Sequence, residues 1–209
     1  RSAGGLWEKY DPAIYANISS FHSMPEKVWQ MFFDMMDLTI HAKPNPGHVG
    51  MGELETRGYL KAVITQNIDN LHQEGGSIRV IEYHGSASKL ECLQCDTKYK
   101  SEEFDMSKRE VPTCTCGTIL KPSVIFFGEA IPPQALIESQ QLAEKADVVI
   151  VGGTSAVVYP AASIPYIAKE HGAKVIELNL EKTGLTGRIT DIFIQGPTGE
   201  TIPKIVELL

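Results

Sequence analysis

Short, nearly continuous runs of apolar residues are the clearest pattern along this chain. They occur at 62–64, 124–127, 148–151 and 175–178. A strand with one face in water alternates apolar and polar residues, whereas a continuous run indicates a strand that is buried on both faces. The pattern therefore predicts a parallel sheet that is covered by helices on both sides.

Helical periodicity separates the later runs. Residues 134–145 place apolar side chains at helical spacing, and residues 161–170 follow Pro160 and stop before Gly172, a residue suited to end a helix. Helices are also expected at 26–40, 50–57 and 203–209. Strands that alternate with helices imply right-handed crossovers, so the expected fold is of the α/β class, a Rossmann-like doubly wound parallel sheet.

The four cysteines form two close pairs in a polar stretch that lacks this rhythm. Cys92 and Cys95 precede Cys114 and Cys116 by roughly 18 residues, a spacing typical of a four-cysteine zinc ribbon. Two disulfides or four free thiols are the alternatives. Cysteines confined to one stretch favour a metal and a reducing compartment. Four thiolates leave no open coordination position, so we expect one structural zinc ion.

The expected domain organisation follows from this inserted stretch. A Rossmann-like domain would consist of residues 1–9, 48–88 and 122–209, interrupted by a helical module at 10–47 and a zinc-binding module at 89–121. A length of 209 residues with 43% hydrophobic residues suits one large domain with a small insert.

Charge and hydropathy narrow the classes of partner. A formal net charge of −7 argues against a broad nucleic-acid-binding surface and is compatible with a lysine-rich protein partner. No apolar run approaches the ~20 residues that cross a bilayer, and the first residues have no signal-peptide pattern. We therefore expect no direct nucleic-acid binding, no membrane partner and a cytoplasmic location.

Polar residues gather where the predicted strands end. Residues 65–69 follow the first run, His84 precedes the cysteine pairs, residues 152–155 follow the third run, and Asn179 ends the fourth. Ligands of α/β sheets bind at the carboxyl ends of parallel strands, so these residues are candidates for a ligand site. From spacing alone, His84 is more often structural than catalytic, and the glycine pair at 152–153 fits a simple tight turn equally well.

The order of these motifs resembles that of one known family. The motifs occur as in prokaryotic-type sirtuins: TQNID at 65–69, HGS at 84–86, the paired cysteines, FFGE at 126–129, GTSAVVYPAA at 153–162 and ELN at 177–179. The resemblance covers essentially the whole chain. It implies a Rossmann-like domain with a small zinc-and-helix domain. It also implies an NAD-dependent protein-lysine deacetylase that produces nicotinamide, O-acetyl-ADP-ribose and the deacetylated lysine.

The resemblance assigns roles to the residues that match the family's motifs. The expected catalytic residues are His84 and Asn67. Histidine is the residue type that commonly accepts a proton at neutral pH, so His84 is expected to deprotonate a ribose hydroxyl. The residues expected to contact NAD, the co-substrate, are Arg1, Gln66, Asn67, Asp69, Gly153, Thr154, Ser155 and Asn179. The residues expected to contact an acetyl-lysine protein or peptide are Ile125, Phe127, Gly128 and Glu129. Such contacts use backbone pairing, which tolerates varied substrate sequences.

Two positions bear on the acyl group that is removed. In family members that remove succinyl or malonyl groups, a tyrosine and an arginine three residues later bind the acid. Alignment on the Pro44-Asn45 landmark places Phe32 and Met35 at these positions. We therefore expect the enzyme to remove neutral acyl groups. Acetyl is the first candidate, and longer neutral chains remain an alternative.

The chain departs from the family pattern at two places. Its second cysteine pair is C-x-C rather than C-x2-C. The family's Gly-Ala-Gly-x-Ser motif, which holds a pyrophosphate at a helix N-terminus after a central strand, would precede Arg1. We therefore expect that the true beginning of the protein lies before this residue. Protein ADP-ribosyl transfer and a catalytically idle acyl-lysine or NAD-metabolite binding module remain alternatives to deacetylation.

Overall fold

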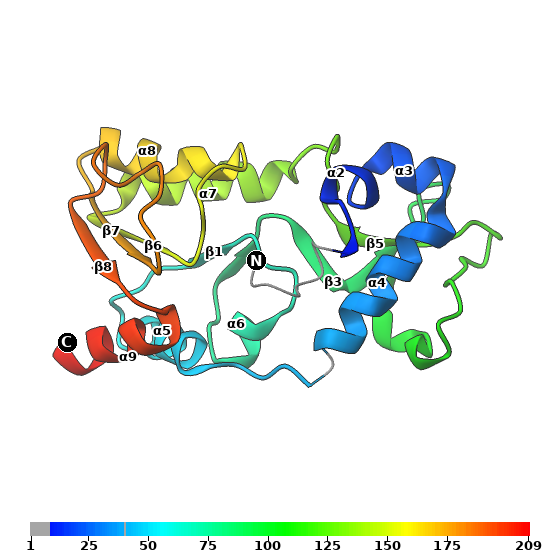
Figure 1. Ribbon diagram of the computed structural model, residues 1–209, viewed down its shortest axis with the longest axis horizontal. Coiled ribbons are helices and arrows are strands. Elements are labelled where there is room, and N and C mark those ends of the chain that lie inside the picture. The colour runs from blue at the N-terminus through cyan, green and yellow to red at the C-terminus, as the bar shows by residue number, and fades with distance from the viewer. Residues whose placement is uncertain (1–8, 40) are drawn as a thin grey trace. The chain divides into compact units, whose positions relative to one another are not determined.

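The computed structural model describes residues 9–39 and 41–209, which divide into two compact units (Figure 1). The first, called the cysteine unit, consists of residues 9–42, Asn67–Asn70 and His84–Ile131. The second, called the parallel-sheet unit, consists of Lys43–Gln66, Leu71–Tyr83 and Pro132–Leu209. Three separate stretches of the chain thus build each unit.

Parallel strands form the centre of the parallel-sheet unit. The strands β6 (Val148–Gly152), β7 (Lys174–Asn179) and β8 (Ile192–Gln195) pair in that order, with Val149 opposite Val175. A second parallel pair joins β1 (Val63–Thr65) to β2 (Val80–Glu82). Among the described residues, no strand links these two sheets.

Helices cover both faces of the β6-β7-β8 sheet, whose strands are orange to red in Figure 1. The helices on one face are α5 (Pro46–Thr56) and α9 (Thr198–Leu208), and those on the other are α7 (Pro133–Lys145) and α8 (Ile164–Glu170). On β7, Leu178 packs with α5 and α9, whereas Val175 belongs to a cluster on the opposite face. This two-sided burial explains why the runs are continuous rather than alternating.

A glycine lets α5 and α9 approach each other closely. A Cβ atom at Gly50 would lie 2.8 Å from the Cγ2 atom of Ile202, which is closer than side-chain carbons pack. The start of α5 is also fixed locally, because the Asn45 side chain accepts hydrogen bonds from the backbone N–H groups of Gly47 and His48. The short segments α6 (Leu71–Glu74) and η3 (Ala161–Ser163) complete this unit.

The cysteine unit contains an antiparallel sheet and a group of helices. The strand order is β4-β3-β5, formed by Lys98–Lys100, Gly85–Glu91 and Lys121–Val124. The helical segments are α2 (Pro12–Tyr15), α3 (Ile18–Ser23), α4 (Pro25–Thr39), η1 (Ser101–Glu103) and η2 (Met106–Lys108).

One hydrophobic core joins the helices of the cysteine unit to its sheet. Val28 and Trp29 of α4 pack in the same buried cluster as Leu90, Cys92 and Leu120. The indole Nε1–H of Trp29 donates a hydrogen bond of 2.8 Å to the carbonyl oxygen of Leu120, so its one polar atom is satisfied inside the core. The helical and cysteine-bearing segments therefore share a single core.

The structure confirms the α/β fold class with a doubly wound parallel sheet. One predicted strand is wrong: the run 124–127 does not lie in a parallel sheet, because β5 ends at Val124 and pairs antiparallel with β3. Residues 10–42 of the expected helical module lie in the same compact unit as the expected zinc-binding module at 89–121, whereas residues 43–47 lie in the parallel-sheet unit. None of the described helices is long and apolar enough to cross a membrane.

We predict that Asp191→Asn lowers the melting temperature at pH 7, because Asp191 links three parts of the parallel-sheet unit. Its carboxylate accepts a 2.8 Å hydrogen bond from the Val175 N–H and pairs with Lys169 and Lys174. The pair with Lys169 and these contacts lower the pKa of Asp191 from 3.8 to about 2. Because the folded pKa is the lower one, the stabilisation is complete above about pH 4 and is lost as the pH falls towards 2.

The measurement is thermal unfolding of both proteins between pH 7 and pH 2. The difference in melting temperature should shrink across the acidic window. Glu181→Gln, a change at an exposed position of the same unit, is the control and should leave the melting temperature unaltered. A difference that persists unchanged at pH 2 would contradict the electrostatic role of Asp191.

Candidate functional site

The four cysteines converge on one point of the cysteine unit. Their Sγ atoms all lie within 4.8 Å of one another, with 3.5 Å between Cys92 and Cys116 and 3.5 Å between Cys95 and Cys114. A disulfide would require about 2.05 Å between sulfurs, so the two-disulfide alternative does not describe this cluster, and all four thiols are free. Four sulfurs around a zinc ion at about 2.3 Å would lie about 3.8 Å apart. The cluster therefore fits a single structural zinc ion.

Backbone turns hold each cysteine pair in place. The Asp96 N–H donates to the Cys92 carbonyl at 3.0 Å, and the Gly117 N–H donates to the Cys114 carbonyl at 2.9 Å. Gly117 has a φ of +89°, in the region that favours glycine. This turn lets the C-x-C pair present both sulfurs to one point, so the shorter spacing is compatible with tetrahedral ligation.

The environment of the thiols differs from one cysteine to another. Burial raises the pKa of the Cys92 thiol to about 11. The backbone N–H of Cys116 and the hydroxyl of Tyr99, 3.2 Å from the Cys114 sulfur, lower the pKa of Cys114 to about 6. A divalent cation at the centre would favour the thiolate form at all four positions.

In the parallel-sheet unit, two predicted NAD-contacting segments lie next to each other at the carboxyl edge of the sheet. Gly153, with a φ of +63°, follows β6, and its N–H donates to the Leu178 carbonyl at 3.0 Å. Asn179, the last residue of β7, donates from Nδ2 to the Thr154 carbonyl at 2.7 Å. Its Oδ1 accepts from the Leu180 N–H at 2.9 Å. Asn179 therefore fixes the loop at 153–155, and Ser155 is half-buried within it.

A buried carboxylate organises the loop that follows Asn179. Glu177 is 1% exposed and accepts hydrogen bonds of 2.6, 2.6 and 2.8 Å from the hydroxyls of Thr183, Thr186 and Thr190. Burial by itself raises the pKa of Glu177, but these hydroxyls outweigh it and hold the pKa below its usual value. The side chain thus stays ionised and ties residues 183–190 to β7.

The predicted catalytic residues gather beside β3 in the cysteine unit. His84 directly precedes β3 and is half-buried, and its carbonyl accepts from the Ile125 N–H at 2.9 Å. The segment Asn67–Asn70 is tied to the same strand, because the Ala87 N–H donates a hydrogen bond to the Ile68 carbonyl oxygen at 3.0 Å. The Ser86 hydroxyl donates to Asn70 Oδ1 at 2.8 Å. Asn67 and Asp69 are exposed on this segment, and Gln66 belongs to the parallel-sheet unit.

The segment predicted to bind the acyl-lysine substrate is a turn with most of its backbone already engaged. The Phe127 N–H donates to the Ala16 carbonyl at 2.8 Å, and the Phe127 carbonyl accepts from the Ile18 N–H at 3.1 Å. Glu129 accepts from the Phe126 N–H through its carboxylate. The Phe127 side chain is 50% exposed. Pairing with a peptide would therefore use the backbone around Gly128, while Phe127 offers its ring.

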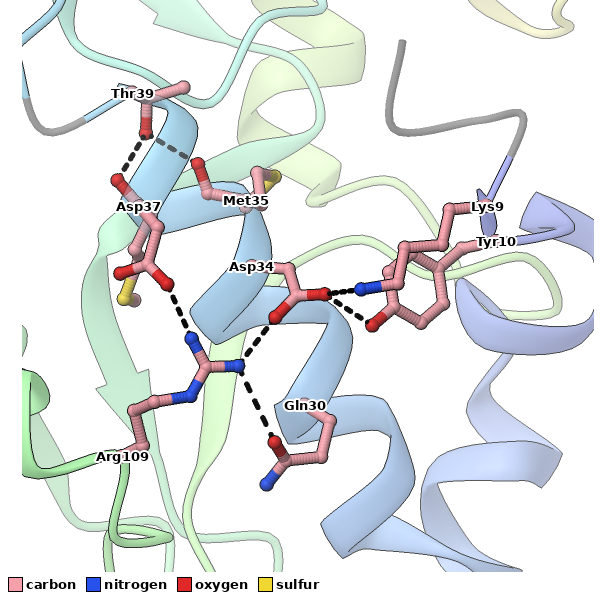
Figure 2. Close-up of polar contacts among 9 residues, drawn as sticks. Lys9, Tyr10, Gln30, Asp34, Met35, Asp37, Thr39 and Arg109 are labelled. Carbon is pink, nitrogen blue, oxygen red and sulfur yellow. Dashed lines mark hydrogen bonds and ion pairs between the residues drawn. The ribbon is translucent and has the colours of Figure 1, made fainter. Parts of the chain in front are cut away.

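A network of charged side chains fixes the exposed face of α4 (Figure 2). Asp34 accepts a 2.6 Å hydrogen bond from the Tyr10 hydroxyl and forms ion pairs with Lys9 and Arg109. The contacts with Lys9, Tyr10 and Arg109 hold the pKa of Asp34 well below its usual range. On the inner face of the helix, Phe32 is 2% exposed and packs in the core. Asp34 therefore ties the start of the described chain and the loop after η2 to this helix.

One predicted residue lies outside the described part of the chain, and two residues beside the site were not predicted. Arg1 precedes the described residues, so its predicted contact with NAD is outside the structure. Lys121 was not predicted as a site residue, although its position as a lone charge among apolar residues 119–127 is the signal that could have found it. Asn17, whose neighbours contact Phe127, carries no comparable signal.

The chain is similar to known proteins along most of its length. A model of the Sir2 family matches residues 1–160. The chain is 49% identical over 211 residues to NAD-dependent protein deacylase 2 of Archaeoglobus fulgidus, covering 99% of this chain and 83% of that protein. It is 45% identical over 212 residues to the NAD-dependent protein deacylase of Thermococcus kodakarensis, covering 99% of this chain and 82% of that protein.

Solved structures of relatives share the fold. The complex of a Sir2 homologue with NAD matches with a TM-score of 0.92 and 41% identity, covering 100% of this chain and 81% of that chain. The structure of Sir2Af2 bound to a myristoylated histone peptide matches with a TM-score of 0.86 and 47% identity, covering 94% and 84% of the two chains.

We predict that the purified protein contains one zinc ion per chain, and that Cys114→Ser removes most of it. Because the metal joins the two turns of the cysteine unit, its loss should lower the melting temperature by roughly 10 °C or more. Elemental analysis and thermal unfolding measure both effects. Thr115→Ser, a change between the two ligands of the second pair, is the control. A substoichiometric zinc content in the unaltered protein, with four titratable thiols, would refute the site.

Proposed function

The chain belongs to the Sir2 family, and on this premise we propose that it is an NAD-dependent protein-lysine deacylase. The observation that carries the proposal is an identity of 41–49% along nearly the whole chain to proteins named NAD-dependent deacylases or deacetylases. The four-cysteine cluster and the doubly wound sheet further support the proposal, because the sequence resemblance implied both.

The proposed reaction transfers an acyl group from a lysine side chain to the ribose of NAD. Acyl-lysine, NAD and water give lysine, nicotinamide and O-acyl-ADP-ribose. In this reaction, His84 would accept the proton of the ribose hydroxyl that attacks the acyl carbon. Asn67 and Asp69, exposed on the segment beside β3, would orient the nicotinamide end of the co-substrate. The loop at 153–155 would contact its phosphates and adenosine ribose.

In this proposal Asn179 both shapes the loop at 153–155 and contacts a ribose hydroxyl of NAD. Its amide already bonds the backbone of Thr154 and Leu180, so it shapes the loop that NAD would meet. The remaining lone pair of Oδ1 and the remaining N–H of Nδ2 are what it can offer to a ribose hydroxyl.

The substrate is proposed to be an acyl-lysine protein or peptide. A relative was solved with a myristoylated histone peptide, and another with a p53 peptide and NAD, which supports extended peptides as substrates. The named relatives favour deacylation over ADP-ribosyl transfer to protein and over an idle binding module.

The four free cysteines of the cluster are compatible with a cytoplasmic location, which we propose for the protein.

We predict that the protein removes acetyl from an acetyl-lysine peptide only when NAD is present, and that His84→Ala lowers kcat at least about 100-fold because a general base is lost. Peptide mass and nicotinamide release, followed together by mass spectrometry, should change in equal amounts. His22→Ala, at an exposed position of α3, is the matched control and should keep full activity. Nicotinamide release with mass added to protein would instead indicate ADP-ribosyl transfer.

We also predict that acetyl-lysine is processed faster than succinyl-lysine. Phe32 is buried and Met35 is apolar, so neither offers a partner for the free carboxylate of a succinyl group, and an unpaired charge in such surroundings is costly. Comparison of kcat/KM on two peptides that differ only in the acyl group measures this. A higher value for the succinyl peptide would show that another residue binds the acid.

A further inference from the structure

The side chain of Lys121 is an unusual feature of the cysteine unit, because it is a lysine with no exposed surface. Its relative exposure is 0%, although it lies at the first position of β5. A buried ammonium is costly unless its protons and its charge are both satisfied. Its partners therefore indicate what the charge does.

The ammonium group has more partners than an ordinary surface lysine. Its Nζ donates to Glu91 Oε1 at 3.1 Å, to the Pro122 carbonyl at 3.2 Å and to the Val124 carbonyl at 2.8 Å, which accounts for its three protons. The carboxylate of Glu129 lies 3.0 Å away, and the ring of Phe126 has its centre 4.8 Å from Nζ. One cation thus lies between two carboxylates, one carbonyl pair and one aromatic face.

The contact with Glu129 reaches the backbone of the predicted substrate segment. The Glu129 Oε2 atom that faces Lys121 also accepts a 2.7 Å hydrogen bond from the Phe126 N–H, and the Glu129 N–H donates to the Phe126 carbonyl at 3.0 Å. Residues 126–129 therefore form a closed turn. The turn includes Gly128, with a φ of +92°. Its shape depends on a carboxylate that pairs with Lys121.

We propose that Lys121 is a positioning residue for the acyl-lysine substrate: its buried charge holds Glu129 against the Phe126 N–H and so fixes the turn that presents Phe127 and Gly128. The inference rests on the proposed deacylase function. It assigns no contact between Lys121 and substrate, because the ammonium is enclosed and its protons are used within the protein.

If Lys121 served only to fill space in the core, no charged group would be needed at this position. An apolar side chain of similar length, such as methionine, could fill the same volume without the cost of burying a charge. The two carboxylates, whose side chains are 30% and 20% exposed, could then turn towards water. What would be lost is the position of Glu129, and with it the bond to the Phe126 N–H.

The test is Lys121→Met in the complete protein, assayed for the KM of an acetyl-lysine peptide and of NAD separately. Loss of a hydrogen bond to a charged group corresponds to about tenfold in an equilibrium, so the peptide KM should rise about tenfold while the NAD KM changes less than about twofold. Hydrogen exchange of the Phe126 amide, a readout independent of turnover, should become faster. Lys98→Met, at an exposed position of β4, is the matched control and should alter neither KM.

A second substitution separates positioning from general loss of structure. In Lys121→Met, the Glu129 carboxylate is left without its cation, and the added change Glu129→Gln removes that charge while keeping an acceptor for the Phe126 N–H. The double variant should therefore recover the slow exchange of the Phe126 amide, a readout that does not depend on any contact of Glu129 with substrate. If Lys121→Met does not fold, Lys121→Gln, which keeps a donor for the carbonyls of β5, takes its place and should give the same selective rise.

The inference is overturned if both KM values and the melting temperature change together, or if the peptide KM stays within twofold of the unaltered protein. It is also overturned if the Phe126 amide exchanges at the same rate in both proteins. Failure of the proposed function is distinct, because the unaltered protein would then neither bind nor deacylate the acetyl-lysine peptide. In that case exchange at Phe126 would still report whether Lys121 holds the turn.

Discussion

The parallel pairing of β6, β7 and β8 is the constraint on which the arrangement of the parallel-sheet unit depends. A parallel sheet requires crossover connections: η3 and α8 connect β6 to β7, and the loop at 180–191 connects β7 to β8. Helices before, within and after this sheet bury both of its faces. All carboxyl ends then meet at one edge, so the loops that follow the strands are neighbours although they are distant in sequence. The bond from Asn179 to the Thr154 carbonyl is a direct result of this geometry.

Buried charges fix the loops that the strands bring together. Glu177 holds three threonine hydroxyls in the loop after β7, and Lys121 holds two carboxylates beside the turn at 126–129. In both places an ionised group lies in low-dielectric surroundings where each hydrogen bond is worth more than in water. Such groups are expensive to bury, and they give a loop one defined conformation where apolar packing would allow several.

The cysteine unit reaches a defined structure by a different route. Its sheet is short and antiparallel, and its core is shared between α4 and the strands that flank the cysteine turns. A zinc ion held by the four thiols would join the two turns covalently and would add stability that so small a sheet lacks. The Trp29–Leu120 bond and the Asp34–Arg109 ion pair connect the same helix to the segments on both sides of the second cysteine pair. Metal, core and helix thus stabilise one unit.

The sequence by itself determined the doubly wound sheet, the four-cysteine cluster and the family, because continuous apolar runs, paired cysteines and ordered motifs are local signals. It did not determine the role of the run 124–127, whose apolar character suits an antiparallel strand end and a packed turn as well as a parallel strand. Nor did it determine the compact units, because the core shared by Trp29 and Leu120 joins segments far apart along the chain. Only the tertiary structure decided that Lys121 is buried between Glu91 and Glu129, since the enclosure of a charge depends on strands and turns that meet only after folding.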